Sequence, residues 1–490
     1  METLAQQDPS NKTATRSPQV DAKSKMKPRI VELLNDWQYL ERTAHRLTAA
    51  WGRHMEEWEG KSALHRHVWD HAVSVRRLRE RVSEFPGGKP DAPVSRHLEE
   101  VANALLFAPS FEDALDGIYL LLLKPLVAAY VDYTNHANPI HDAPTMAVLH
   151  EINQTRSLQW LWFRDYRRRH PHTTCANYRA RVEAAIAGCD HFLQPQAVDP
   201  QNPAKPCGVD SNFALPKFSA RTFPTQPKED FMPFVRADFR HSLEARRLFW
   251  AYAYMLEKNL PDDQLAWIYY GHDMPWDWHH DISRHLWDES RHGDSGYSRL
   301  QDFGISIAEV GFPSYNNDEK VAALDAALGG GHPRDVKDFE DHIVCGIPMK
   351  PMSAHDLYEA AFFIGMVAEN GHFIVKNEAY QDFKDGQDFE SAEMMLFDII
   401  DETTHVQYAH RWLPLLAEKA GISNDGYRQR AAKMRAQAES NEAVALRQLA
   451  LDRSPDNPAY VFYQSLLDRI RSVSPLKNAD SCPERSAKPM

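Results

Sequence analysis

Cysteine is scarce in this chain, and the few cysteines do not form a recognisable motif. The sequence has five cysteines in 490 residues, widely scattered and without a Cys-x-x-Cys pair. Their odd number and wide spacing argue against a disulfide framework and against a rubredoxin-type iron centre within the chain. Because such a pattern is typical of a reducing compartment, we expect a cytoplasmic protein.

Long apolar runs and an excess of basic residues are also missing. No stretch resembles the roughly 20 apolar residues of a membrane-spanning helix, and the polar N-terminus lacks the apolar segment of a secretory signal. The formal net charge is −13, with both signs well mixed, which argues against a nucleic-acid-binding protein. The basic cluster at residues 164–170 is interpreted as a solvated helix end. We expect neither a membrane nor nucleic acid as a partner.

Strand-like alternation of polar and apolar residues is scarce, and helical periodicity dominates. Apolar residues recur at three-and-four spacing through residues 28–190 and again through 234–472. Between these regions, residues 191–233 carry a proline every few residues, which indicates a linker or an extended strap. The sequence therefore predicts an all-α protein with two helical domains, flanked by disordered tails at 1–27 and 473–490.

The two helical regions contain short similar segments. Residues 58–72 (WEGKSALHRHVWDHA) align without gaps with 276–290 (WDWHHDISRHLWDES), and 150–160 (HEINQTRSLQW) align with 398–408 (DIIDETTHVQY). Such self-similarity predicts two copies of one helical unit. The first copy has lost residues that bind hard divalent metals: it has His71 and Ser74 in place of Glu289 and His292, and Gln154 and Ser157 in place of Glu402 and His405.

The metal-binding prediction starts from two Glu-x-x-His pairs in the second copy. Glu289 precedes His292 by three residues, and Glu402 precedes His405 by three. Residues i and i+3 lie on one face of a helix, so each pair can reach a single ion. Paired polar helix faces are the alternative, but the repetition of the whole phrase favours a metal site.

Two earlier carboxylates are predicted to complete a dinuclear site. Glu369 precedes Glu402 by 33 residues, and Glu257 precedes Glu289 by 32 residues, which are similar distances from mid-helix to mid-helix of a hairpin. Pro261 follows Glu257 by one turn and is expected to end or kink that helix. Glu244 is therefore kept as the alternative to Glu257.

This ordered set resembles the ferritin-like di-iron carboxylate superfamily over about residues 236–420. DESRH (288–292) is similar to the DExRH phrase of di-iron oxygenases and desaturases, and DETTH (401–405) is similar to its second copy. The resemblance implies two ferritin-like helical bundles in tandem, the first degenerate, with a long connection at about 304–352 in the second. It also implies that the Glu and His residues bind iron, that Asp288 and Asp401 support the ligand histidines, and that Arg291 neutralises a buried carboxylate.

Three more residues lie one turn from a predicted ligand. His285 precedes Glu289, His372 follows Glu369, and Asp398 precedes Glu402. Some ferritin-like N-oxygenases, which this pattern resembles, carry an extra histidine ligand. His285, however, aligns with His67 of the copy that lost its ligands, which favours a structural role for it.

The mixed carboxylate and imidazole set suits iron, with manganese as an alternative metal. It predicts a non-haem di-iron oxygenase or oxidase with two Fe (Fe2+/Fe3+) and O2 as co-substrate, acting on a small organic substrate with electrons from the substrate or an external donor. An HD-type metal phosphohydrolase built on His280 and Asp281, beside His279, is one alternative. A non-catalytic metal-binding scaffold or subunit is another. Either a monomer or a homodimer is compatible with the sequence, because the first copy can take the place of a second subunit.

Overall fold

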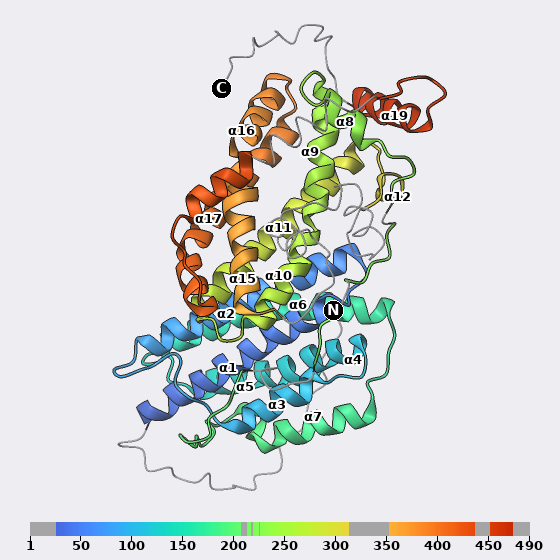
Figure 1. The fold of residues 1–490 in the computed structure, drawn as a ribbon. Helices are drawn as coiled ribbons and strands as arrows, with labels where there is room; N and C mark the ends of the chain where they lie inside the picture. The colour runs from blue at the N-terminus through green and yellow to red at the C-terminus, as the bar shows by residue number, and fades with distance from the viewer. Residues whose placement is uncertain are drawn as a thin grey trace.

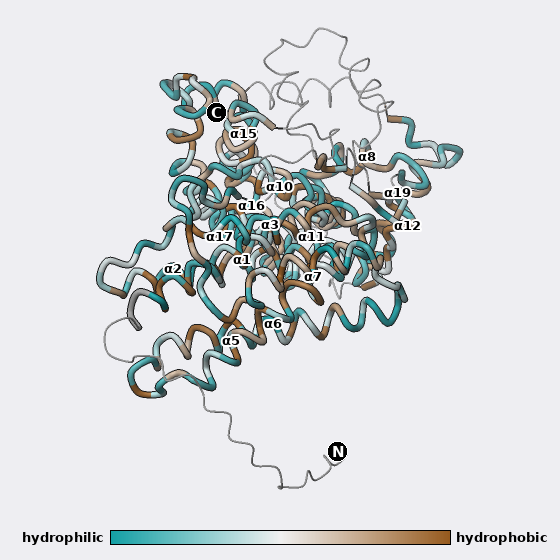
Figure 2. The backbone as a smooth tube through the Cα atoms, turned by 90° about the horizontal axis from the view of Figure 1, so that it is seen from below, coloured by the Kyte–Doolittle hydropathy of each residue, from teal (hydrophilic) through white to brown (hydrophobic). Residues whose placement is uncertain are grey.

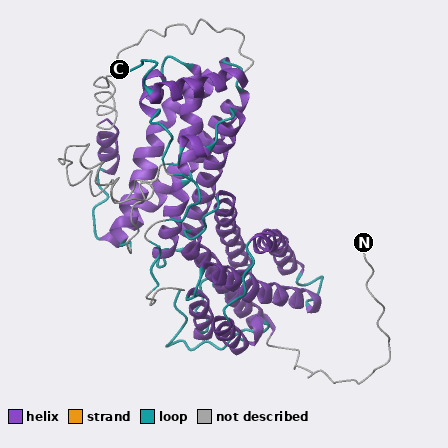
Figure 3. Ribbon diagram, turned by 90° about the vertical axis from the view of Figure 1, so that its right-hand side faces the viewer, coloured by secondary structure: helices purple, strands orange, loops and turns teal. Residues whose placement is uncertain are grey.

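The computed structural model describes residues 26–206, 213–216, 219–224, 226–312, 352–436 and 451–473. Within these ranges the chain is helical and contains no strand (Figure 3), so the all-α prediction is confirmed. Nearly all of the two predicted tails, most of the connection at 304–352, and Cys207, Cys345 and Cys482 lie outside the described residues.

The N-terminal half is a group of helices that forms the lower part of the molecule in Figure 1. Apolar residues recur among polar ones along these helices, as in other amphipathic helices of a folded domain (Figure 2). The elements are α1 (Met26–Gly52), α2 (Trp58–Ser83), α3 (Arg96–Leu106), α4 (Phe111–Asp116), the π-helix η1 (Gly117–Leu123), α5 (Lys124–His136), α6 (Ala143–Arg169), α7 (Ala176–Gly188) and the short η2 (Asp190–Phe192).

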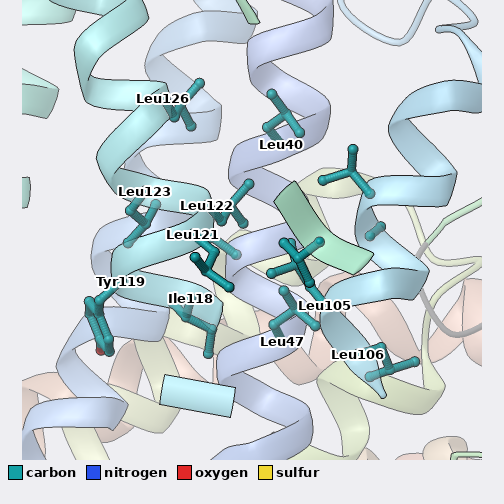
Figure 4. Packing of buried hydrophobic residues seen from close by; sticks show 14 of the residues in the cluster. Leu40, Leu47, Leu105, Leu106, Ile118, Tyr119, Leu121, Leu122, Leu123 and Leu126 are labelled. Atoms are coloured by element: carbon teal, nitrogen blue, oxygen red, sulfur yellow. The ribbon is translucent and has the colours of Figure 1, made fainter. Parts of the chain in front are cut away.

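One helical stretch contradicts the expectation that no segment is apolar enough to span a membrane. Among the described residues, Phe111–His136 meets that criterion by length and composition, although most of its apolar window is buried within the protein. Ile118 and Leu122 of this stretch lie in one buried cluster with Leu40 of α1 and Leu105 of α3 (Figure 4). A core helix passes the same compositional test, so the test alone does not make this stretch a membrane span.

The C-terminal half forms the upper part of the molecule in Figure 1. Its long helix α11 packs against α9, α10 and α17, and α17 also packs against α15, η3 and α16. The elements are α8 (Met232–Asp238), α9 (Leu243–Glu257), α10 (Asn259–Tyr270), α11 (Trp276–Asp302), α12 (Ile307–Val310), α15 (Ala354–Phe362), the π-helix η3 (Phe363–Glu369), α16 (Asn370–Asp385), α17 (Phe389–Ala420) and α19 (Pro458–Val473).

The two halves meet where α2 packs along α11. The Trp69 and Trp287 rings are stacked, with centroids 6.2 Å apart and planes inclined by 8°. The Arg66 guanidinium lies 4.4 Å from the Trp287 ring, and the Arg284 guanidinium lies 5.7 Å from the Trp69 ring. Both Trp69–Trp287 and Arg66–Arg284 are separated by 218 residues, the offset of the aligned segments. The halves therefore touch through reciprocal contacts, as identical subunits do across a twofold axis.

The predicted alignment of α6 with α17, its counterpart in the second copy, is wrong by two residues. Gln154 and Ser157, which were expected to replace two ligands, are exposed, whereas Arg156 and Gln159 are buried. The counterparts of the buried Glu402 and His405 should also face the interior of their bundle. The burial pattern of α6 therefore decides which of its residues align with them.

A pair of matching contacts supports the corrected register. Gln159 Nε2 on α6 donates to Asp70 Oδ2 on α2 at 3.3 Å. His405 Nε2 on α17 lies 3.3 Å from Asp288 Oδ2 on α11, and Asp288 is the counterpart of Asp70 at the 218-residue offset. Gln159 thus corresponds to His405, and Arg156, three residues earlier, corresponds to Glu402.

Candidate metal centre

The six residues predicted as main ligands converge in the interior of the C-terminal half. They come from the end of α9, the middle of α11, the end of η3 and the middle of α17, and all are buried except the half-buried Glu257. The structure brings together Glu257, Glu289, His292, Glu369, Glu402 and His405 in overlapping groups of candidate metal-binding atoms.

One group, which we call position 1, consists of His285, Glu289, Glu369 and His405. His285 Nε2 lies 2.8 Å from Glu369 Oε1 and 3.2 Å from Glu289 Oε1. His405 Nδ1 lies 3.3 Å from Glu289 Oε1 and 3.4 Å from Glu369 Oε1. Donors bound to one ion at about 2.1 Å are separated by roughly 3.0–3.4 Å, so these four side chains can surround a single metal ion.

Two further groups, one of Glu257, His292 and Asp398 and one of Glu289, His292 and Glu402, share His292, and we call them together position 2. His292 Nδ1 lies 3.3 Å from Glu257 Oε2, 3.5 Å from Asp398 Oδ1 and 3.7 Å from Glu289 Oε2. Glu289 therefore turns one oxygen toward position 1 and the other toward position 2. A carboxylate in this arrangement can bridge two ions.

Glu257 reaches this site although its helix ends there. Helix α9 ends at Glu257 and α10 begins at Asn259, so the expected effect of Pro261 on the helix is confirmed. The alternative candidate, Glu244, lies in the first turn of α9, where its carboxylate accepts a hydrogen bond from Ser242. The structure therefore places Glu257, and not Glu244, beside His292.

Of the three secondary candidates, His285 and Asp398 belong to these groups. His285, for which its alignment with His67 favoured a structural role, directs Nε2 at Glu289 and Glu369. Its counterpart His67 instead makes a hydrogen bond of 2.6 Å with the Tyr119 hydroxyl. His372, in contrast, is exposed and belongs to none of the groups.

Several buried donor atoms of this centre have no hydrogen-bond partner among the described residues, which leaves them available to a cation. Three ring nitrogens, His285 Nε2, His292 Nδ1 and His405 Nδ1, are buried without a hydrogen bond, as are oxygens of Glu289 and Glu369. In folded proteins a buried polar atom is usually paired, because an unpaired one costs free energy, so a cluster of unpaired donors is compatible with bound cations. A set of imidazole nitrogens and carboxylate oxygens fits two divalent ions such as iron or manganese.

Two carboxyl groups of position 2, those of Glu257 and Glu402, have raised pKa values. Burial raises the pKa of Glu257 to about 7. Burial and the neighbouring Glu369, Asp398 and Glu289 raise the pKa of Glu402 well above its ordinary value, although Lys376 opposes the shift. Crowded carboxylates in a dry interior repel one another, and bound cations would remove this penalty.

Two aspartates hold the outer nitrogens of the ligand histidines. Asp401 Oδ2 lies 3.2 Å from His292 Nε2, and Asp288 Oδ2 lies 3.3 Å from His405 Nε2. Each aspartate can accept the Nε2 proton, which would leave Nδ1 free to bind a metal ion. Burial alone would raise the pKa of Asp288, but His405 and Arg284 outweigh it and hold that pKa well below the ordinary value.

Two arginines neutralise these aspartates. Arg291 Nη2 donates to Asp288 and, at 2.7 Å, to Asp401. Arg284 Nε donates to both oxygens of Asp288 at 2.8 and 2.9 Å. Arg291 therefore contacts buried carboxylates, as expected. The similar contact that Arg284 makes with Asp288 was not predicted from the sequence. Its position, four residues before Asp288 on the same helix, was the signal that could have found it.

Lys376 is the other polar residue that the sequence did not reveal. It lies on α16, and its Nζ is 2.7 Å from Glu402 Oε1 and 2.8 Å from Asp398 Oδ2. Burial alone would lower the pKa of Lys376, but Glu402 and Asp398 raise it well above the ordinary value. Its spacing of seven residues from Glu369 places it on the same face of the helix and could have drawn attention to it.

The N-terminal half carries an arginine where the C-terminal half has Glu402. Arg156 Nη2 donates to Glu41 Oε2 at 2.6 Å and to Ser74 Oγ at 2.8 Å. Glu41 also contacts His71 Nδ1 at 3.0 Å and accepts a bond from the Tyr130 hydroxyl. The fixed positive charge of Arg156 thus satisfies the buried carboxylate without a metal.

The His280–Asp281 pair shows no sign of a second metal site among the described residues. Asp281 accepts hydrogen bonds from Arg411 Nη1 and Trp412 Nε1, both at 2.9 Å. Neither His280 nor Asp281, nor the adjacent His279, belongs to a group of candidate metal-binding atoms. Within the described part of the chain, the pair therefore lacks the further spaced ligands that a metal phosphohydrolase requires.

A narrow recess reaches position 1 from the side of α10, α15 and α17. Its cavity volume is about 30 Å³, which is enough for a water molecule or for O2. His285 and His405 form its inner end, and its apolar wall includes Trp267, Trp278, Ile282, Ile364, Tyr408 and Trp412. The recess thus has a largely aromatic wall that extends to His285 and His405, two candidate ligands of position 1.

Comparisons with known proteins add no identification. No protein-family model, no curated protein and no solved structure matches this chain.

Proposed function

We propose that this protein is an O2-dependent, non-haem di-iron oxygenase or oxidase that acts on a small organic substrate. The observation that carries this proposal is the pair of buried ligand groups that share Glu289. Structural zinc sites are typically closed and four-coordinate, whereas this centre has mixed oxygen and nitrogen donors and a recess leading to position 1. Two iron ions at these positions would supply the redox chemistry with O2.

The chain's own residues hold and shield this centre. Asp288 and Asp401 fix the orientation of His405 and His292 by accepting their Nε2 protons. The apolar wall around His285 and His405 excludes bulk water, which strengthens electrostatic interactions inside the site. The recess volume is too small for an organic substrate at rest, so we expect substrate binding to require side-chain movement at Tyr408 or Trp412.

We also propose that both halves of the chain are ferritin-like bundles of common origin. The reciprocal contacts of Trp69 with Trp287, and the matching Asp70–Gln159 and Asp288–His405 contacts, support a duplication. In this interpretation the N-terminal half has exchanged its metal for Arg156 and serves as the partner that a homodimer would otherwise supply.

Iron titration followed by exposure to O2 tests the proposed function. Metal-free protein is titrated with Fe(II) without oxygen, and O2 consumption and the near-UV and visible spectrum are then recorded. We expect about two irons per chain and consumption of O2. Glu289→Ala should lose both, because Glu289 serves both positions, whereas Glu244→Ala should retain both.

The same experiment separates the proposed function from its alternatives. Iron binding without any consumption of O2, with or without candidate reductants, would favour a non-catalytic metal-binding protein. Absence of iron binding, or binding that is equal in wild type and Glu289→Ala, would contradict the centre itself.

A further inference from the structure

Lys376 is a buried cation inside the candidate metal centre. Its side chain is 2% exposed, and its ammonium lies between the carboxylates of Asp398 and Glu402. Both carboxylates belong to position 2. A metal ion at position 2 would therefore share two of its carboxylate ligands with a positively charged side chain.

Position 1 has no such competitor. Among the described residues, the ion-pair partners of Glu289 and Glu369 are histidines of the centre, and no lysine or arginine lies within ion-pair distance of either carboxylate. Because two positive charges that share a carboxylate repel each other, a divalent ion should bind more weakly at position 2 than at position 1.

The balance of charge allows the Lys376 ammonium to stay beside Asp398 and Glu402 when both ions are bound. Five carboxylates form the centre: Glu257, Glu289, Glu369, Asp398 and Glu402. Two divalent ions leave one of these five negative charges without a counter-charge, and the ammonium of Lys376 supplies it. Buried charges persist when they are paired in this way.

We propose that Lys376 is a fixed third cation of the centre that makes its two metal positions unequal. Position 1 binds the first divalent ion, and position 2 binds the second more weakly because it shares Asp398 and Glu402 with Lys376. This inference rests on the metal centre of the proposed function and is independent of the reaction with O2.

Titration of the metal-free full-length protein with Mn(II) tests the inference. Calorimetry gives the affinity of each binding step, and electron paramagnetic resonance reports whether a bound Mn(II) is alone or coupled to a second ion. In wild type we expect a single uncoupled ion first, and a second step at least about tenfold weaker. Lys376→Met, which removes the charge and keeps a similar length, should tighten the second step about tenfold or more and change the first step less.

Two further variants keep the test decisive. Lys258→Met removes another buried lysine, which is bonded to Asp294 and Ser290 and not to a candidate ligand, so both steps should stay as in wild type. Lys376→Gln is also neutral but can still donate hydrogen bonds to Glu402 and Asp398. It should tighten the second step like Lys376→Met, even if the methionine variant does not fold.

The results that overturn the inference differ from those that overturn the proposed function. Equal affinities for two ions in wild type, or a second step that is unchanged or weaker in both Lys376 variants, would contradict the role of Lys376. Stepwise binding that follows the expected pattern, without O2 consumption by the iron-loaded protein, would contradict only the oxygenase or oxidase proposal. A wild-type protein that binds no metal would overturn both.

Discussion

Asp288 Oδ2 lies 3.3 Å from Nε2 of His405, so a carboxylate on α11 holds a candidate ligand on α17. The reverse contact also exists, because Asp401 on α17 holds His292 on α11 at 3.2 Å. Each of the two central helices thus orients the histidine of the other. Since a metal-bound histidine depends on the partner of its outer nitrogen, these two contacts would make metal affinity depend on Asp288 and Asp401, which are not candidate ligands themselves.

Replacement of Asp288 should weaken metal binding without removing a ligand. In Asp288→Asn the amide is a poorer acceptor for the His405 Nε2 proton, so His405 Nδ1 becomes a weaker and less well oriented donor. We expect the affinity for the first Mn(II) to fall about 10- to 100-fold, measured by calorimetry. Asp70→Asn is the matched control, because Asp70 is the counterpart of Asp288 and contacts Gln159 instead of a histidine. Equal metal affinities in the two variants would contradict the orienting role.

Replacement of His285 should identify it as a ligand rather than a structural residue. His285→Ala removes a ring nitrogen that lies 2.8 Å from Glu369 and 3.2 Å from Glu289. We expect the first binding step to weaken at least about tenfold, on the scale of one lost ligand or support. His67→Ala should leave metal affinity unchanged and lower only stability, since His67 bonds to Tyr119. A His285→Ala protein that binds the first ion as tightly as wild type would assign His285 a structural role.

The fold class and most of the candidate site could be predicted because they depend on local periodicity. Spacings of three and four residues place Glu289 with His292, and Glu402 with His405, on single helix faces whatever the rest of the fold does. The similar intervals to Glu257 and Glu369 then follow from hairpin geometry.

The errors concern properties that local spacing does not determine. The alignment of α6 with α17 was wrong because the two segments share too few residues to fix it. The burial of Arg156 and Gln159 depends instead on how α6 packs against the other helices. Lys376 was missed because a lysine at a helical position is usually solvated. Only the approach of α16 to α17 shows that Lys376 contacts Glu402.

The pH dependence of stability should reflect a buried carboxyl group in the N-terminal half. Burial, with help from Glu32, raises the pKa of Asp36 from 3.8 to about 7, against the lowering effect of the Gln196 backbone N–H. A carboxyl with a raised folded-state pKa binds a proton more tightly when folded, so the contribution of Asp36 to stability is greatest below pH 3.8 and falls as the pH rises toward 7. Asp36→Asn should therefore gain stability relative to wild type between pH 5 and 8.

Urea unfolding at pH 5 and pH 8 measures this effect. We expect the difference in free energy of unfolding between Asp36→Asn and wild type to be larger at pH 8 than at pH 5. The exposed Asp456 provides the control, and Asp456→Asn should shift both values equally. A difference for Asp36→Asn that does not depend on pH would show that this carboxyl is ionised in the folded protein.

Arg156 should stabilise the N-terminal half by the same charge that a metal would provide. Glu41 is fully buried, and burial alone would raise its pKa, but Arg156 and His71 outweigh that effect and lower the pKa to about 2. Arg156→Leu leaves this carboxylate without its cation, and the loss of one partner of a buried ion pair costs about 3–5 kcal/mol. Chemical denaturation near neutral pH should therefore show a large loss of stability. Adding Glu41→Gln to Arg156→Leu should restore much of it, because the pair is then removed together. If the double variant is no more stable than Arg156→Leu alone, the cost lies in the packing of the arginine, and the interpretation of Arg156 as a substitute for a metal is wrong.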